Sequence, residues 1–66
     1  MPYLNDDLER LIDQRIHSER DRKILKRRLI DGVLFKELEK EFGYSERHIK
    51  RIVYKAQNIL FKHFEP

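Results

Sequence analysis

The chain contains no cysteine, and its 66 residues include only two glycines and two prolines. Without cysteine, neither a disulfide nor a thiolate metal site can stabilise the fold. A chain this short cannot divide its buried surface between two cores, so we expect a single domain over residues 1–66. Its stability must come from helix packing or from a partner.

Long apolar runs are also missing. The first ten residues, MPYLNDDLER, carry acids where a secretory signal has a basic region followed by an apolar run. No stretch approaches the roughly 20 apolar residues that a membrane-spanning helix needs. We therefore expect a cytoplasmic protein with no membrane partner.

Charge is distributed unevenly along the chain. Residues 1–21 carry three basic and six acidic side chains, a net charge of −3, whereas residues 22–66 carry twelve and six, a net charge of +6. Such asymmetry favours a polyanionic partner for one face, although solvated helix surfaces also carry many lysines.

Apolar residues recur every three or four positions, and strict alternation is absent, which predicts an all-α fold. We expect four helices over about 6–17, 19–31, 35–42 and 46–64. Asn5, Ser18 and Ser45 are suited to N-cap the first, second and fourth, with Asp21 completing a capping box. Gly32 and Gly43 would end the second and third helices in the left-handed conformation.

One apolar stripe on each helix should build a common core. The expected core residues are Leu8, Leu11, Ile12 and Ile16; Ile24, Leu25 and Leu29, with the stem of Arg28; Phe35, Leu38 and Phe42; and Ile49, Ile52, Val53, Ala56, either Ile59 or Leu60, and Phe64.

The last two helices are joined by only three residues, Gly43-Tyr44-Ser45. A left-handed glycine turns the chain sharply, and apolar positions on both sides require the helices to cross over a shared core. This pattern predicts a C-terminal helix-turn-helix, with Tyr44 as a plug over the core.

The second helix of this motif has a polar outer side. Arg and Lys can bond the N7 and O6 edge of guanine, and Glu can accept a hydrogen bond from cytosine, so this side fits the major groove of double-stranded DNA. The predicted base contacts are Glu46, Arg47, Lys50, Arg51 and Tyr54. The predicted phosphate contacts are Arg22, Lys23, Lys26, Arg27, Lys36, Ser45 and Lys55, together with the exposed N–H groups at the helix start.

Other roles stay open for two of these positions, Glu46 and Tyr54, and for the neighbouring His48. Glu46 and His48 are equally suited to a capping or surface role, and Tyr54 to covering the edge of the core.

Residues 20–60, RDRKILKRRLIDGVLFKELEKEFGYSERHIKRIVYKAQNIL, resemble region 4 of sigma-70-type transcription factors. They are more similar still to small sigma-region-4-like proteins of phages and mobile elements in Gram-positive bacteria. The most specific features are Asp31-Gly32 followed by Phe35 and Leu38, the FGYSERHIKRI segment, and Lys55-Ala56. The resemblance implies an all-helical domain that contacts promoter DNA through the second helix of the motif, as a transcriptional regulator of bacterial or phage origin.

Three departures from that family are visible. Leu34 stands where relatives have a Ser or Thr N-cap, so the third helix should start less firmly. Glu39 stands where alanine is usual, and should tilt outward or find a basic neighbour. No region 2 precedes the domain, so we do not expect the chain to melt a promoter.

The alternatives belong to other classes. A protein-interaction module with the shape of region 4 would bind RNA polymerase or an anti-sigma-type partner. A homodimer would cover the surplus of apolar residues around Phe61. We expect no enzyme activity, cofactor or metal, because Ser18 and Ser45 are caps and the three histidines lack a zinc-site spacing. A basic amphipathic helix at a membrane surface is the weakest interpretation.

Overall fold

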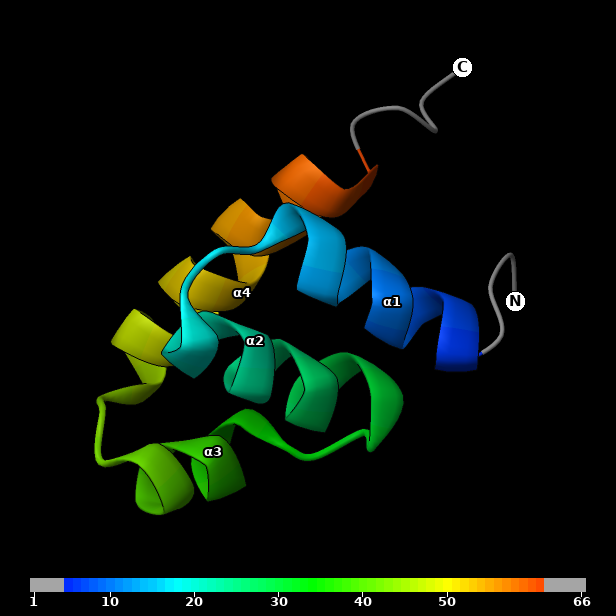
Figure 1. Ribbon diagram of the computed structural model, residues 1–66. Coiled ribbons are helices and arrows are strands. Elements are labelled where there is room, and N and C mark those ends of the chain that lie inside the picture. Colours follow the sequence, from blue (N-terminus) through cyan, green and yellow to red (C-terminus); the bar gives the residue numbers. More distant parts are fainter. Residues whose placement is uncertain (1–4, 62–66) are drawn as a thin grey trace.

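A computed structural model describes residues 5–61 of the chain, all of whose regular elements are helices (Figure 1). They are α1 (Asn5–Arg15), α2 (Glu19–Leu25), a π-helical turn η1 (Lys26–Ile30), α3 (Phe35–Phe42) and α4 (Glu46–Phe61). Because η1 directly continues α2, the arrangement amounts to four helices. No strand occurs in residues 5–61, so the prediction of an all-α fold is confirmed.

Both ends of α1 differ slightly from the prediction. Asn5 is already helical rather than the residue before the helix, and the last helical residue is Arg15 rather than His17. The earlier end has a physical cause, because the Arg22 guanidinium donates to the carbonyl oxygens of Ile16 at 2.6 Å and His17 at 3.2 Å. Those carbonyls are thereby satisfied without a further helical turn.

The helix predicted over residues 19–31 is present, but its second half is wider than an α-helix. The N–H of Asp31 donates to the carbonyl oxygen of Lys26, five residues back, at 3.1 Å. The N–H of Val33 donates to the carbonyl oxygen of Arg27 at 3.0 Å. Gly32 follows with φ 71°, which confirms its left-handed conformation. A π turn of this kind is rare and shifts the side chains that follow by one position around the axis.

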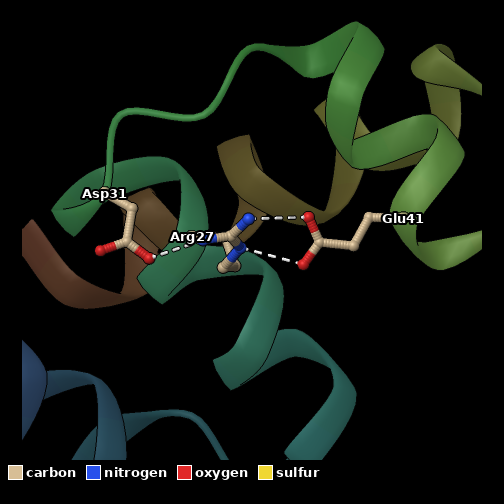
Figure 2. A network of polar contacts seen from close by, with 3 residues as sticks. All are labelled: Arg27, Asp31 and Glu41. Carbon is tan, nitrogen blue, oxygen red and sulfur yellow. Dashed lines mark hydrogen bonds and ion pairs between the residues drawn. The ribbon is translucent and has the colours of Figure 1, made fainter.

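Arg27 lies in the π turn and joins it to α3. Its Nε and Nη2 atoms donate to the two carboxylate oxygens of Glu41 at 2.9 and 3.0 Å, and Nη1 donates to Asp31 at 3.1 Å (Figure 2). The hydrogen bond with Glu41, and to a smaller extent that with Asp31, raises the pKa of Arg27. A two-pronged contact fixes orientation as well as distance, so it holds Arg27 and Glu41 in one geometry between the π turn and α3.

The core lies where α4 packs against α1, α2 and α3. The fully buried side chains are Ile12, Ile24, Leu25, Leu38, Ile49, Val53 and Leu60, and the other buried side chains are Leu8, Ile16, Ile52 and Ala56. Between the two alternatives at the end of α4, the structure buries Leu60 and leaves Ile59 43% exposed. The predicted core residues Leu11, Leu29, Phe35 and Phe42 are half-buried against this cluster. Phe64 and the predicted extension of the last helix to residue 64 lie outside the described residues.

The predicted caps divide into two groups. Ser18 Oγ accepts from the N–H of Asp21 at 3.3 Å, and Ser45 Oγ accepts from the N–H of His48 at 3.2 Å, as expected for N-caps. At the start of α3, Leu34 has the extended backbone of an N-cap, with φ −68° and ψ 151°, but makes no side-chain cap hydrogen bond. The third helix therefore begins without the stabilisation that a Ser or Thr would supply.

Candidate functional site

The connection between α3 and α4 is held in place by its glycine and its tyrosine. Gly43 has φ 76°, and its N–H bonds the Glu39 carbonyl at 2.9 Å, so α3 ends in a left-handed cap. Tyr44 is half-buried against the core, and its ring lies 4.9 Å from that of His48. The Arg20 guanidinium covers the same ring at 5.3 Å, which links the connection to the start of α2. A hydrogen bond with Tyr44, and to a smaller extent one with Asp21, raises the pKa of Arg20.

The first turn of α4 is capped from two sides. Besides the bond from His48 to Ser45, the N–H of Glu46 donates to the Glu39 carboxylate at 2.7 Å. Glu39 is exposed, as expected, but its partner is this backbone group rather than the basic side chain that we considered. The N–H groups of Glu46 and His48 are exposed, as expected, but each already has a hydrogen-bond acceptor within the domain. A carboxylate already occupies the position where a bound phosphate would be most favoured.

The outer side of α4 carries three exposed cations, Arg47, Arg51 and Lys55. Within residues 5–61 no carboxylate forms an ion pair with any of them. Arg47 and Arg51, with Ser45 and His48, line a shallow hollow of about 440 Å³ on the first two turns. These guanidinium groups are available to an external anion or hydrogen-bond acceptor.

Glu46 and Lys50 behave differently from the other predicted base contacts. They are half-buried and pair with each other at 3.1 Å, one turn apart on α4. Lys50 Nζ also lies 5.5 Å from the centre of the Phe35 ring. To meet a base, either side chain must leave this pair, which is partly exposed and therefore weak.

Tyr54 packs at the edge of the core and is also exposed, so its contact with a base stays a prediction. Its ring meets that of Phe35 edge-on at 6.2 Å, so it covers the edge of the core, yet 54% of the residue is exposed. The guanidinium of Arg28 stacks on the other ring of this pair at 4.2 Å. The contact with Phe35 therefore orients the exposed Tyr54 ring at the edge of the core.

The predicted phosphate contacts separate into engaged and available side chains. Lys26 pairs with Asp13 at 2.8 Å and Glu9 at 4.0 Å, and Lys23 lies 3.8 Å from Glu19. Arg27 is held by Glu41 and Asp31, and Arg22 by the carbonyls at the end of α1. Lys36 and Lys55 are exposed and have no ion pair among the described residues, while Ser45 serves as a cap.

Sequence reasoning overlooked two arginines. Arg15 and Arg20 belong to the acidic first third of the chain, yet they line one hollow with Arg51 and Lys55 of α4. Their place in the sequence could have indicated this, because they lie on either side of the short connection at residues 16–18, where the chain reverses direction (Figure 1). The negative net charge of residues 1–21 gave no indication of where the individual cations of that segment lie.

Comparison of the chain with models of known protein families, with curated protein sequences and with solved structures gave no match. Among the described residues, no helix has the length and apolar character required to cross a bilayer. The same part of the chain holds no group of three or more His, Asp or Glu side chains arranged to bind a metal ion.

Proposed function

We propose that the protein is a sequence-specific DNA-binding protein of the helix-turn-helix type, with an arrangement similar to sigma region 4, and that it regulates transcription in a bacterial or phage context. It would act in the cytoplasm on double-stranded DNA. The observation that carries this proposal is a row of three exposed cations, Arg47, Arg51 and Lys55, along the outer side of a helix whose other side is buried. None of the three forms an ion pair with any of residues 5–61.

The dimensions of α4 suit such a role. Its 16 residues form a rod about 24 Å long and about 10–12 Å across, and the major groove of B-DNA is about 12 Å wide. The buried residues Ile49, Val53 and Leu60 hold one side against the domain, so the opposite side is the one that would enter the groove. Arg47 and Arg51, one turn apart, would reach successive base edges.

The connection before α4 supports the same interpretation. A left-handed Gly43, a half-buried Tyr44 and a capping Ser45 are what a helix-turn-helix requires of these three positions. The resemblance of residues 20–60 to sigma region 4 assigns base contact to the helix that follows this turn.

The base contacts are tested by substitution. We expect Arg47→Ala or Arg51→Ala to weaken binding to a preferred duplex by about 1–3 kcal/mol and to have less effect on random duplexes. The preferred sequence would first be selected from a random duplex pool, and binding measured by gel-shift titration. Lys26→Ala is the matched control, because that lysine already pairs with Asp13 and Glu9, so we expect only a modest loss for all sequences. Equal losses on preferred and random duplexes would refute sequence reading by these arginines.

An interaction module that binds RNA polymerase, or an anti-sigma-type partner, is the second candidate. It is favoured by the exposure of two large side chains, Leu34 at 66% and Tyr54 at 54%. Large exposed apolar side chains are common in protein interfaces. Co-purification with polymerase after nuclease treatment, without a duplex shift at low salt, would favour this candidate over the first.

A further inference from the structure

A second basic hollow lies between the connection from α1 to α2 and the middle of α4. It measures about 370 Å³ and is lined by residues of both segments, which lie next to each other in Figure 1. Four basic side chains, Arg15, Arg20, Arg51 and Lys55, line it against a single carboxylate, Asp21. The net charge of its lining is therefore +3 before the two histidines of the lining are considered.

The charges of this hollow are not neutralised within the described part of the chain. Asp21 pairs with Arg20 at 3.0 Å, so the carboxylate is used by one of the four cations. Arg15, Arg51 and Lys55 are exposed and form no ion pair with any residue from 5 to 61. Cations gathered in a concave surface repel one another and attract an anion.

The anion must be one that can lie beside α4. His48, Arg51 and Lys55 follow one another at three- and four-residue steps and so share one flank of that helix. Arg51 also lines the hollow at the start of α4, so the two basic hollows adjoin. A helix in the major groove has a phosphate backbone along each flank, at the two edges of the groove.

We propose that the hollow between the α1–α2 connection and α4 binds a backbone phosphodiester of the duplex that α4 enters. Arg15 and Arg20 would donate to the phosphate from one side and Lys55 from the other, while the exposed imidazoles of His17 and His48 supply further N–H donors. This inference rests on the proposed function and goes beyond it, because it assigns the phosphate contact to the first third of the chain.

Arg15 gives the cleanest test, since no side-chain contact of this residue would be lost on substitution within the described structure. Losing one phosphate contact should make the negative slope of log K against log salt concentration less steep by about 0.9 and weaken duplex binding about eightfold at about 0.1 M salt. The probe is a fluorescent random-sequence duplex, because a phosphate contact does not depend on sequence, and binding is followed by anisotropy. We expect these changes for Arg15→Gln, and little change for Arg15→Lys.

The matched control is Arg10→Gln, which removes the same charge from the same helix. Arg10 lines a different hollow, among Asp6, Glu9 and Asp13, and we expect its substitution to leave the slope nearly unchanged. Equal slopes for Arg15→Gln and Arg10→Gln would overturn the assignment. If thermal melts show that Arg15→Gln unfolds the domain, Arg15→Lys becomes the test, and a loss of duplex affinity in Arg15→Lys would also overturn the assignment.

A free phosphate ion has the same chemistry as a backbone phosphate, so a second experiment distinguishes the two ligands. Inorganic phosphate is titrated against the isolated chain while the NMR signals of His17 and His48 are followed. Saturable phosphate binding combined with wild-type duplex binding by Arg15→Gln would overturn the backbone assignment. If the unaltered chain binds no duplex at low salt, the proposed function itself fails. Duplex binding with an unchanged slope in Arg15→Gln removes only this inference.

Discussion

Glu39 provides a test in which stability and DNA affinity should change in opposite directions. Its carboxylate accepts a hydrogen bond from the N–H of Glu46 at 2.7 Å and so places a negative charge at the N-terminus of α4. That charge stabilises the helix, because the helix dipole is positive at this end. It also repels a DNA phosphate approaching the same N–H groups.

The two effects have comparable sizes. Removing an N-terminal cap costs about 1 kcal/mol, so Glu39→Ala should lower the melting temperature of a domain this small by about 4–8 °C. A carboxylate and a phosphate about 6 Å apart in water repel each other by about 0.7 kcal/mol, which corresponds to about a threefold change in Kd. Glu39→Gln keeps an oxygen that can accept the hydrogen bond and loses the charge, so it should gain most of the affinity and lose less stability.

Urea unfolding followed by circular dichroism measures the stability of each variant, and duplex binding at low salt measures the affinity. Glu37→Gln is the matched control, because it makes the same change at another exposed position of α3, one with no hydrogen bond to α4 among the described residues. The reasoning would be refuted if Glu39→Gln bound the duplex no more tightly than Glu37→Gln. A Glu39→Ala protein as stable as wild type would show that the cap contributes nothing.

Two further predictions concern local backbone chemistry. Leu34 has the backbone of an N-cap and is 66% exposed, so Leu34→Ser should add a cap without emptying the core and should raise the free energy of unfolding by about 0.5–2 kcal/mol; an unchanged or lower urea midpoint would contradict this. Gly43 has φ 76°, and a Cβ there would meet nothing within 4 Å, so Gly43→Ala should cost only the left-handed backbone penalty of about 1–2 kcal/mol. Gly43→Asn should cost less, since asparagine tolerates that conformation, and equal urea midpoints for the two variants would argue against backbone strain as the cause.

Local sequence signals predicted the elements well because short-range physics decides them. The period of three to four residues predicted four helices, and the two glycines predicted where the second and third would end. Ser18 and Ser45 form the expected caps, since a cap needs only its own residue and the N–H three positions on. The buried stripe of α4 followed from its apolar spacing alone. Whether this helix reads DNA stays a prediction.

The partners of the charged side chains could not be predicted from the sequence. Arg27 meets Glu41 across fourteen positions because a π turn rotates it toward α3, and Lys26 meets Asp13 because α1 packs beside the π turn. Glu39 caps a helix that begins seven residues later because the chain turns back at Gly43. A long charged side chain has many nearly equal partners, and only the packing of the helices selects one of them.

The sequence by itself therefore determined the number and approximate bounds of the helices, which side of each helix is apolar, and that the cations outnumber the acids after residue 21. Tertiary structure alone decided which cations remain available: it engages Arg22, Lys26 and Arg27 in internal contacts and brings Arg15 and Arg20 beside Arg51. The physical reason is distance. Helical periodicity acts over a few residues, whereas an ion pair depends on which segments the hydrophobic core brings together.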